Sequence, residues 1–142
     1  MSIVQTLTTS FKGQLPLAVH DFTTDTMKLA LYLSTANLGA DTTVYTAATV
    51  YTATGESTGT GYTAGGIVLT NATVLTYGTT VYIDFDDAAW AGVLTARGGL
   101  IYNYSKANKS VAVINFGADK TSASTFTVQM PANTYTSALI RI

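Results

Sequence analysis

The chain has 142 residues and a formal net charge of −1, and only 11% of its residues are charged, where an ordinary domain has about 25%. It contains no cysteine, which excludes disulfides, thiolate metal sites and a cysteine nucleophile. The sequence also lacks the basic stripes that neutralise phosphates, and no stretch approaches the ~20 apolar residues of a membrane span. We therefore expect neither a nucleic-acid partner nor a membrane partner.

The composition favours β-structure. Roughly one residue in five is threonine, and nine are tyrosine; both types prefer a pleated, half-buried surface. The length suits one domain with its own core. We expect residues 1–142 to form a single all-β domain, a β-sandwich or jelly-roll-like barrel of about eight strands.

The N-terminal segment is the only helical candidate. Apolar residues recur there at a spacing near 3.6, among them Leu7, Phe11 and Phe22. Pro16 falls inside this pattern and removes a backbone hydrogen bond. The pattern predicts one short or kinked helical segment within about residues 5–21.

Strands are expected through residues 27–142. Met27–Ser34 alternates between large apolar residues and a mixed set, as in a strand with one face toward a core. The tetrapeptide T-V-Y-T then occurs twice, at Thr43–Thr46 and Thr49–Thr52, which favours a longer hairpin or a projecting loop. Further strands are predicted at 67–76, 81–85, 94–104, 111–116, 126–130 and 138–142. Turn signals separate them, including "DDAAWAG" and "GADKTSAS".

The glycine-rich stretch "GTGYTAGGIVLT", Gly59–Thr70, is close to a dinucleotide-binding pattern. Such a loop needs a strand before it and a helix after it, because the helix N-terminus holds the pyrophosphate. The residues that follow are β-branched and have no helical period. We expect no cofactor, and we expect Gly65 and Gly66 to allow positive φ or a bulge at a sheet corner.

The chain has one histidine, His20, followed by Asp21. A general base would need a nucleophile nearby, and no G-x-S-x-G elbow is present. We interpret His20 as a hydrogen-bonded cap or a surface residue and predict no catalytic residues. Arg97, one of few arginines, is expected to pair with an aspartate of the preceding loop, with a substrate role as the weaker alternative.

The segment "DFDDAAW" places three carboxylates close together: Asp84, Asp86 and Asp87. They are weak candidates for a hard-cation site, since oxygen ligands suit Ca²⁺. The glycine and the distant glutamate of an EF-hand loop are missing. The simpler interpretation is a strand end that leads into a turn, with Trp90 packed in the core.

The tyrosines suggest a contact surface. Interface cores are rich in aromatic residues and poor in lysine and glutamate, and the low charge points the same way. The interface candidates are Tyr45, Tyr51, Tyr62 and Tyr82. An aromatic face that binds glycans is the alternative, and half-buried packing at sheet rims is the simplest interpretation.

Several segments carry a likeness to a known group of proteins. They are "SFKGQL" followed by "HDF", "KLALYLSTANLGADTTVYT", "GTGYTAGG", "TARGGLIYN", "KSVAVINFGADKTS" and the closing "ALIRI". In these segments, which cover nearly the whole chain in the same order, the sequence resembles small virion proteins of tailed bacteriophages. Pro16 and the second T-V-Y-T copy are departures from that group.

The resemblance implies a non-enzymatic structural protein located in the virion. It would decorate or stabilise the capsid or the head–tail region through contacts between many copies. Its partners would be major capsid or tail proteins and further copies of itself. The alternative is a tail-fibre or host-receptor module that binds a glycan. The group implies no catalytic residues.

Overall fold

The computed structural model describes residues 2–45 and 55–142, and it confirms the predicted all-β, sandwich-like fold. The strands of the described part are β1 (Thr6–Leu7), β2 (Met27–Tyr32), β3 (Ile67–Val68), β4 (Thr73–Tyr77), β5 (Thr80–Asp84), β6 (Ala88–Ala91), β7 (Thr95–Asn103), β8 (Lys109–Thr121), β9 (Thr125–Val128) and β10 (Ile140–Arg141). They form a five-stranded sheet in the order β1-β8-β7-β2-β3, a three-stranded sheet β10-β5-β4 and a two-stranded sheet β6-β9.

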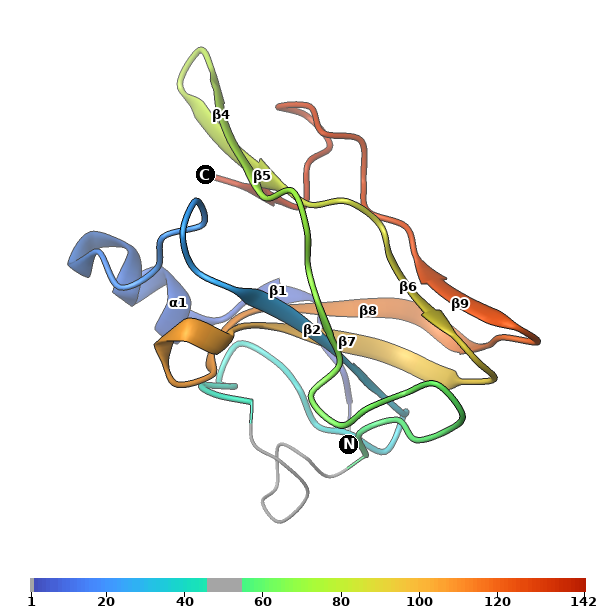
Figure 1. The fold of residues 1–142 in the computed structure, drawn as a ribbon. Helices are drawn as coiled ribbons and strands as arrows, with labels where there is room; N and C mark the ends of the chain where they lie inside the picture. Colours follow the sequence, from blue (N-terminus) through green and yellow to red (C-terminus); the bar gives the residue numbers. More distant parts are fainter. Residues whose placement is uncertain (1, 46–54) are drawn as a thin grey trace.

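The two smaller sheets lie against one face of the five-stranded sheet (Figure 1). The main core lies between them and joins Leu29 and Ile101 of the large sheet to Ile83, Trp90 and other residues of the small sheets. Burial of apolar area of this kind is the dominant stabilising term in folding. One layer of the sandwich is therefore a single continuous sheet, and the other layer consists of two separate small sheets.

The opposite face of the large sheet is also covered. A second cluster joins alternate residues of the same strands, Ala30 and Tyr32 of β2 and Tyr102 of β7, to Leu38 and Tyr45 outside the sheet. The alternation predicted for Met27–Ser34 is therefore present, with Met27, Leu29 and Leu31 in one cluster and Ala30 and Tyr32 in the other. Irregular chain, rather than a second sheet, covers this face.

The helical segment is short, as expected, and spans fewer residues than the predicted range 5–21. Helix α1 (Thr9–Gln14) is followed by the 3₁₀ turn η1 (Leu15–Leu17), which contains the proline. Thr8 is the N-cap, and its side chain accepts from the Phe11 N–H at 3.4 Å. Leu7 is in β1 and not in the helix, because it pairs with β8. None of the helices in the described residues is long and apolar enough to cross a membrane.

Two segments predicted as turns are strands. Ala88–Ala91 forms β6 because it pairs with β9, which brings Trp90 opposite Phe126. β8 continues through Thr121 because its last residues pair with the start of β7, Lys120 with Ala96 and Thr121 with Thr95, beyond a register shift between Ala96 and Gly98. The glycine at position 117, with φ +82°, lies in this irregular part of β8. β1, β6 and the division of the 67–76 segment into β3 and β4 bring the strands of the described residues to ten, above the expected eight.

The first T-V-Y-T copy forms no strand in its described part. Val44 makes only an isolated bridge with Lys109, which begins β8. The second copy, Thr49–Thr52, lies outside the described residues.

Trp90→Ala is predicted to lower the free energy of unfolding by about 3–5 kcal/mol, the usual cost of deleting a large buried aromatic side chain. Trp90 is 4% exposed and lies against Phe126 and Tyr62, with ring centroids 6.3 and 6.2 Å away. Urea denaturation measures the change. Tyr104→Ala, at a residue 57% exposed, is the control and should cost less than about 1 kcal/mol. Equal effects of the two substitutions would contradict the placement of Trp90 in the core.

Candidate functional site

The glycine-rich stretch is a loop that leads into β3, so no helix follows it. Gly65 and Gly66 have φ values of +98° and +82°, which confirms the positive φ predicted for them. A Cβ on Gly66 would overlap the carbonyl oxygen of Leu29 in β2. These glycines therefore let the loop lie directly on the large sheet, and the loop leads into a strand instead of the helix N-terminus that a dinucleotide phosphate would require.

The loop surrounds the side chain of Glu56, the only glutamate of the chain. Its Oε1 accepts from the Tyr62 hydroxyl and from the Gly65 N–H, both at 2.8 Å, and its Oε2 accepts from the Tyr45 hydroxyl at 3.1 Å. Three donors on one carboxylate are the arrangement that makes a partly buried charge tolerable. No motif in the sequence predicted this role for Glu56; the one available signal is that it is a lone glutamate among threonines and glycines.

A stacked pair of tyrosines extends this network to the large sheet. The rings of Tyr45 and Tyr102 are 4.6 Å apart and nearly parallel. The Tyr102 hydroxyl donates to the Gly65 carbonyl oxygen at 2.6 Å. The Gly65 N–H thus donates to Glu56, and its carbonyl oxygen accepts from Tyr102. The second of these bonds fixes the loop to β7.

The tyrosine hydroxyls of this network stay protonated. Burial, together with the negative charge of Glu56, raises the pKa of Tyr32, Tyr45 and Tyr62 well above 10. The Tyr32 hydroxyl is fully buried and has no hydrogen-bond partner among the described residues. Of these hydroxyls, those of Tyr45 and Tyr62 donate to the Glu56 carboxylate, which ties the loop to the residues around it.

His20 is held by hydrogen bonds through both ring nitrogens. Nε2 lies 2.7 Å from Oε1 of Gln14, and Nδ1 lies 3.0 Å from Nδ2 of Asn103. Because the amide nitrogen of Asn103 only donates, Nδ1 accepts and Nε2 carries the proton. Burial lowers the pKa of His20, which favours this neutral form. Neither nitrogen is left to take a proton from a serine or threonine nucleophile.

The three aspartates at the end of β5 have separate surroundings. Asp84 is only 2% exposed, and burial raises its pKa. Asp86 accepts from the side chain of Asn71, and Asp87 accepts from the Met130 N–H at 2.7 Å. Within residues 2–45 and 55–142, no three acidic or histidine side chains gather into a group that could hold a metal ion.

Arg97 pairs with a different aspartate from the one expected. Its guanidinium lies 3.3 Å from the Asp119 carboxylate, and both side chains are more than a third exposed. Asp119 is in β8, the neighbour of β7, so strand pairing and not the preceding loop supplies the partner. An exposed pair of this kind contributes little to stability.

The tyrosine interface candidates are placed mostly inside the molecule. Tyr45 is 6% exposed, Tyr62 is half-buried and hydrogen-bonded to Glu56, and Tyr82 is half-buried in β5. Tyr51 lies outside the described residues. Tyr45 and Tyr62 are bound internally because Glu56 accepts from both hydroxyls. The large exposed tyrosines are others: Tyr77, Tyr104 and Tyr135.

The hairpin of β4 and β5, residues 73–84, projects from the body of the molecule, and we call it the arm (Figure 1). Val74, Leu75 and Tyr77 of β4 are 43%, 43% and 59% exposed. Tyr77 stacks on Tyr135 with ring centroids 4.1 Å apart. No charged residue occurs in the arm before Asp84. β4 is the edge strand of its sheet, since β5 is its only partner in the part of the chain that the structure describes.

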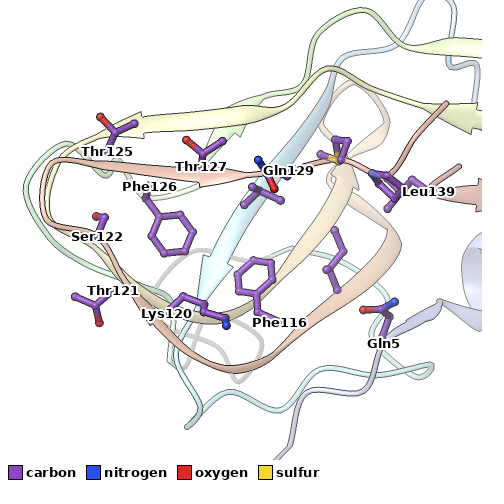
Figure 2. A pocket seen from close by; sticks show the side chains of 14 residues that line it. Gln5, Phe116, Lys120, Thr121, Ser122, Thr125, Phe126, Thr127, Gln129 and Leu139 are labelled. Atoms are coloured by element: carbon purple, nitrogen blue, oxygen red, sulfur yellow. The ribbon is translucent and has the colours of Figure 1, made fainter. Parts of the chain in front are cut away.

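A groove opens between the last part of β8 and β9 (Figure 2). Its volume is about 560 Å³, within the range of about 300–1,000 Å³ that is usual for binding sites. Phe116 and Phe126 point into it, with ring centroids 6.2 Å apart. Lys120 is the one charged residue among those that line it.

No family model matches the chain, and no curated protein or solved structure is detectably similar to it. Two surfaces of the molecule face outward with unpaired strand edges and apolar side chains. They are the arm and the groove.

Gly66→Ala is predicted to destabilise the fold by at least about 2 kcal/mol, from backbone strain at positive φ and from overlap with β2. Gly13→Ala is the matched control, because position 13 lies in α1 with open space around it. That substitution should be neutral or stabilising by up to about 1 kcal/mol. Thermal or urea unfolding of both variants tests the role of Gly66, and a Gly66→Ala protein as stable as the wild type would refute it.

The tyrosine network predicts a loss of stability at alkaline pH. Above about pH 10 the native state keeps protons that the unfolded tyrosines release, so the free energy of unfolding falls as pH rises. Tyr32→Phe removes one such group. It should therefore reduce the slope of the free energy of unfolding against pH by up to about 1.4 kcal/mol per pH unit. Urea unfolding from about pH 8 to about pH 11 measures the slope. An unchanged slope in Tyr32→Phe would count against this account.

Proposed function

We propose that the protein is a non-enzymatic structural subunit that works in multiple copies, with the arm as its principal contact. The observation that carries the proposal is an exposed, uncharged edge strand with apolar side chains, β4. Native proteins protect such edges with lysine, proline, bulges or a covering element. β4 has no lysine or proline, and its pairing with β5 runs without a bulge. An arm of this kind is suited to being covered by a neighbouring subunit.

The setting that we propose is the particle of a tailed bacteriophage. There the protein would decorate or stabilise the capsid or the head–tail region, in contact with major capsid or tail proteins. The support is the likeness of the sequence segments quoted above and the low share of charged residues, 11%. A surface that neighbours cover needs less charge for solubility than a free monomer does. The contribution would be mechanical, since area buried between subunits opposes their separation.

A second candidate function is a fibre or receptor-binding module for glycans. The observation that favours it is the exposed stacked pair of Tyr77 and Tyr135. Tyrosine is enriched at binding interfaces because its ring is apolar and its hydroxyl is polar. A glycan array probed with the wild type and with Tyr135→Ala separates the two candidates, because only a glycan receptor would show saturable binding that this substitution removes.

The arm proposal predicts that Leu75→Lys weakens self-association at least about tenfold, equivalent to about 1.4 kcal/mol. A lysine there brings a charge into the apolar contact, which must then be desolvated. Leu17→Lys is the matched control, since Leu17 is 72% exposed in η1, outside the arm. Sedimentation over a concentration series measures the association. A wild-type protein that is monomeric throughout, or equal effects of the two variants, would refute the arm as the contact.

The proposed location has its own test. Cryo-microscopy of intact virions should contain density for this fold on the capsid or at the head–tail region, in many copies. Absence of the chain from purified virions would reject the location and favour a free binding module.

A further inference from the structure

The groove lies between two strand edges that have no strand partner. Among the described strands, β9 pairs only with β6, which leaves its other edge open. β8 pairs with β1 only at Ala112 and Val113, and the side chain of Gln5 then takes the Asn115 N–H. Beyond Asn115 no strand of residues 2–45 or 55–142 lies along the outer edge of β8. The second layer of the sandwich thus ends at a place where one more strand would fit.

Backbone groups of β9 face this opening. The Gly92 N–H donates to the Ser124 carbonyl oxygen at 2.7 Å. Hydrogen-bonded pairs recur at every second residue of an antiparallel ladder, so Phe126 and Val128 carry the bonds to β6. The N–H and C=O groups of Thr125 and Thr127 then point away from β6, into the groove. They are available to an added strand.

The floor of the groove is apolar and its rim is polar. Phe116 and Phe126 lie on the floor, with Thr127 and Gln129 at the edge (Figure 2), and Val128 also lines the groove. A strand added here would form main-chain hydrogen bonds with β9 and place alternate side chains on the phenyl rings. Strand addition to an open sheet edge uses this combination of backbone pairing and side-chain pockets.

The same chain carries a strand that fits. β4 has an open edge and apolar side chains at Val74, Leu75 and Tyr77. It has five residues, against four in β9. The arm before Asp84 is uncharged, so its entry would bury no unpaired charge of its own. No residue of the arm lines the groove of its own copy, and the arm points away from it (Figure 1).

We propose that β4 of one copy adds to β9 of the next and extends the β6–β9 sheet across the boundary between copies. This inference rests on the proposed multi-copy function and names its contact. Because the arm and the groove are different surfaces, the contact is head-to-tail, and repetition gives a ring or a filament. The groove is filled in the assembly and open in a single copy.

Cross-linking tests the contact directly, because the chain has no cysteine of its own. Thr76→Cys labels the arm and Thr127→Cys labels the groove edge. The two single variants are mixed and treated with a short bismaleimide linker, which bridges neighbouring thiols without requiring one register. Leu17→Cys mixed with Thr127→Cys is the matched control. We expect at least about tenfold more cross-linked dimer from the arm–groove mixture than from the control.

The other outcomes are distinguishable. If Thr76→Cys links only to itself, the arms pair with each other; this overturns arm-in-groove docking and leaves the multi-copy proposal standing. If no mixture cross-links and the wild type sediments as a monomer, both proposals fail. Equal yields from the arm–groove mixture and the control would also overturn the contact.

Discussion

Burial of both faces of the β2–β7–β8 sheet is the constraint on which the other features depend. Successive residues of β2 and β7 enter different cores, Leu29 and Ile101 on one face and Ala30 and Leu100 on the other. A sheet with two apolar faces needs two covers. One cover consists of strands, whose backbone N–H and C=O groups form hydrogen bonds with each other. The other cover consists of irregular chain, whose backbone groups need other hydrogen-bond partners, such as side chains.

Glu56 and the tyrosines supply part of those partners. The segment that carries Glu56 is tied to the large sheet at several points: the Ser57 N–H donates to the Leu31 carbonyl oxygen, and the Leu31 N–H donates to the Tyr62 hydroxyl. The carboxylate also joins this segment to Tyr45, which lies 11 residues before Glu56 in the sequence. A buried charge with three donors costs little while all of them remain in place, and much if one is removed. This explains why tyrosines that resemble contact residues in the sequence lie inside.

The outward-facing surfaces arise from the divided second layer. Two small sheets cover the main core, and division leaves edges that a single continuous sheet would have paired. One edge lies on the arm, exposed on both faces, and another borders the groove. In a chain with so few charges, these edges are the surfaces that most need covering. An assembly built from such subunits would satisfy its edges between copies, and this is the physical basis of both proposals.

The sequence by itself determined the elements whose signals are local. Alternation along Met27–Ser34 predicted β2, Pro16 predicted a short helix, and Gly65 with Gly66 predicted positive φ, because each depends on neighbouring residues or on one residue's own stereochemistry. Only the tertiary structure decided what depends on distant partners. "AAWA" reads as a turn until β9 lies beside it. Tyr45 and Tyr77 are the same residue type in similar threonine-rich segments, yet one donates to Glu56 and the other is exposed. The groove likewise exists only because β8 and β9, which follow each other in the sequence, join different sheets and leave a space between their edges.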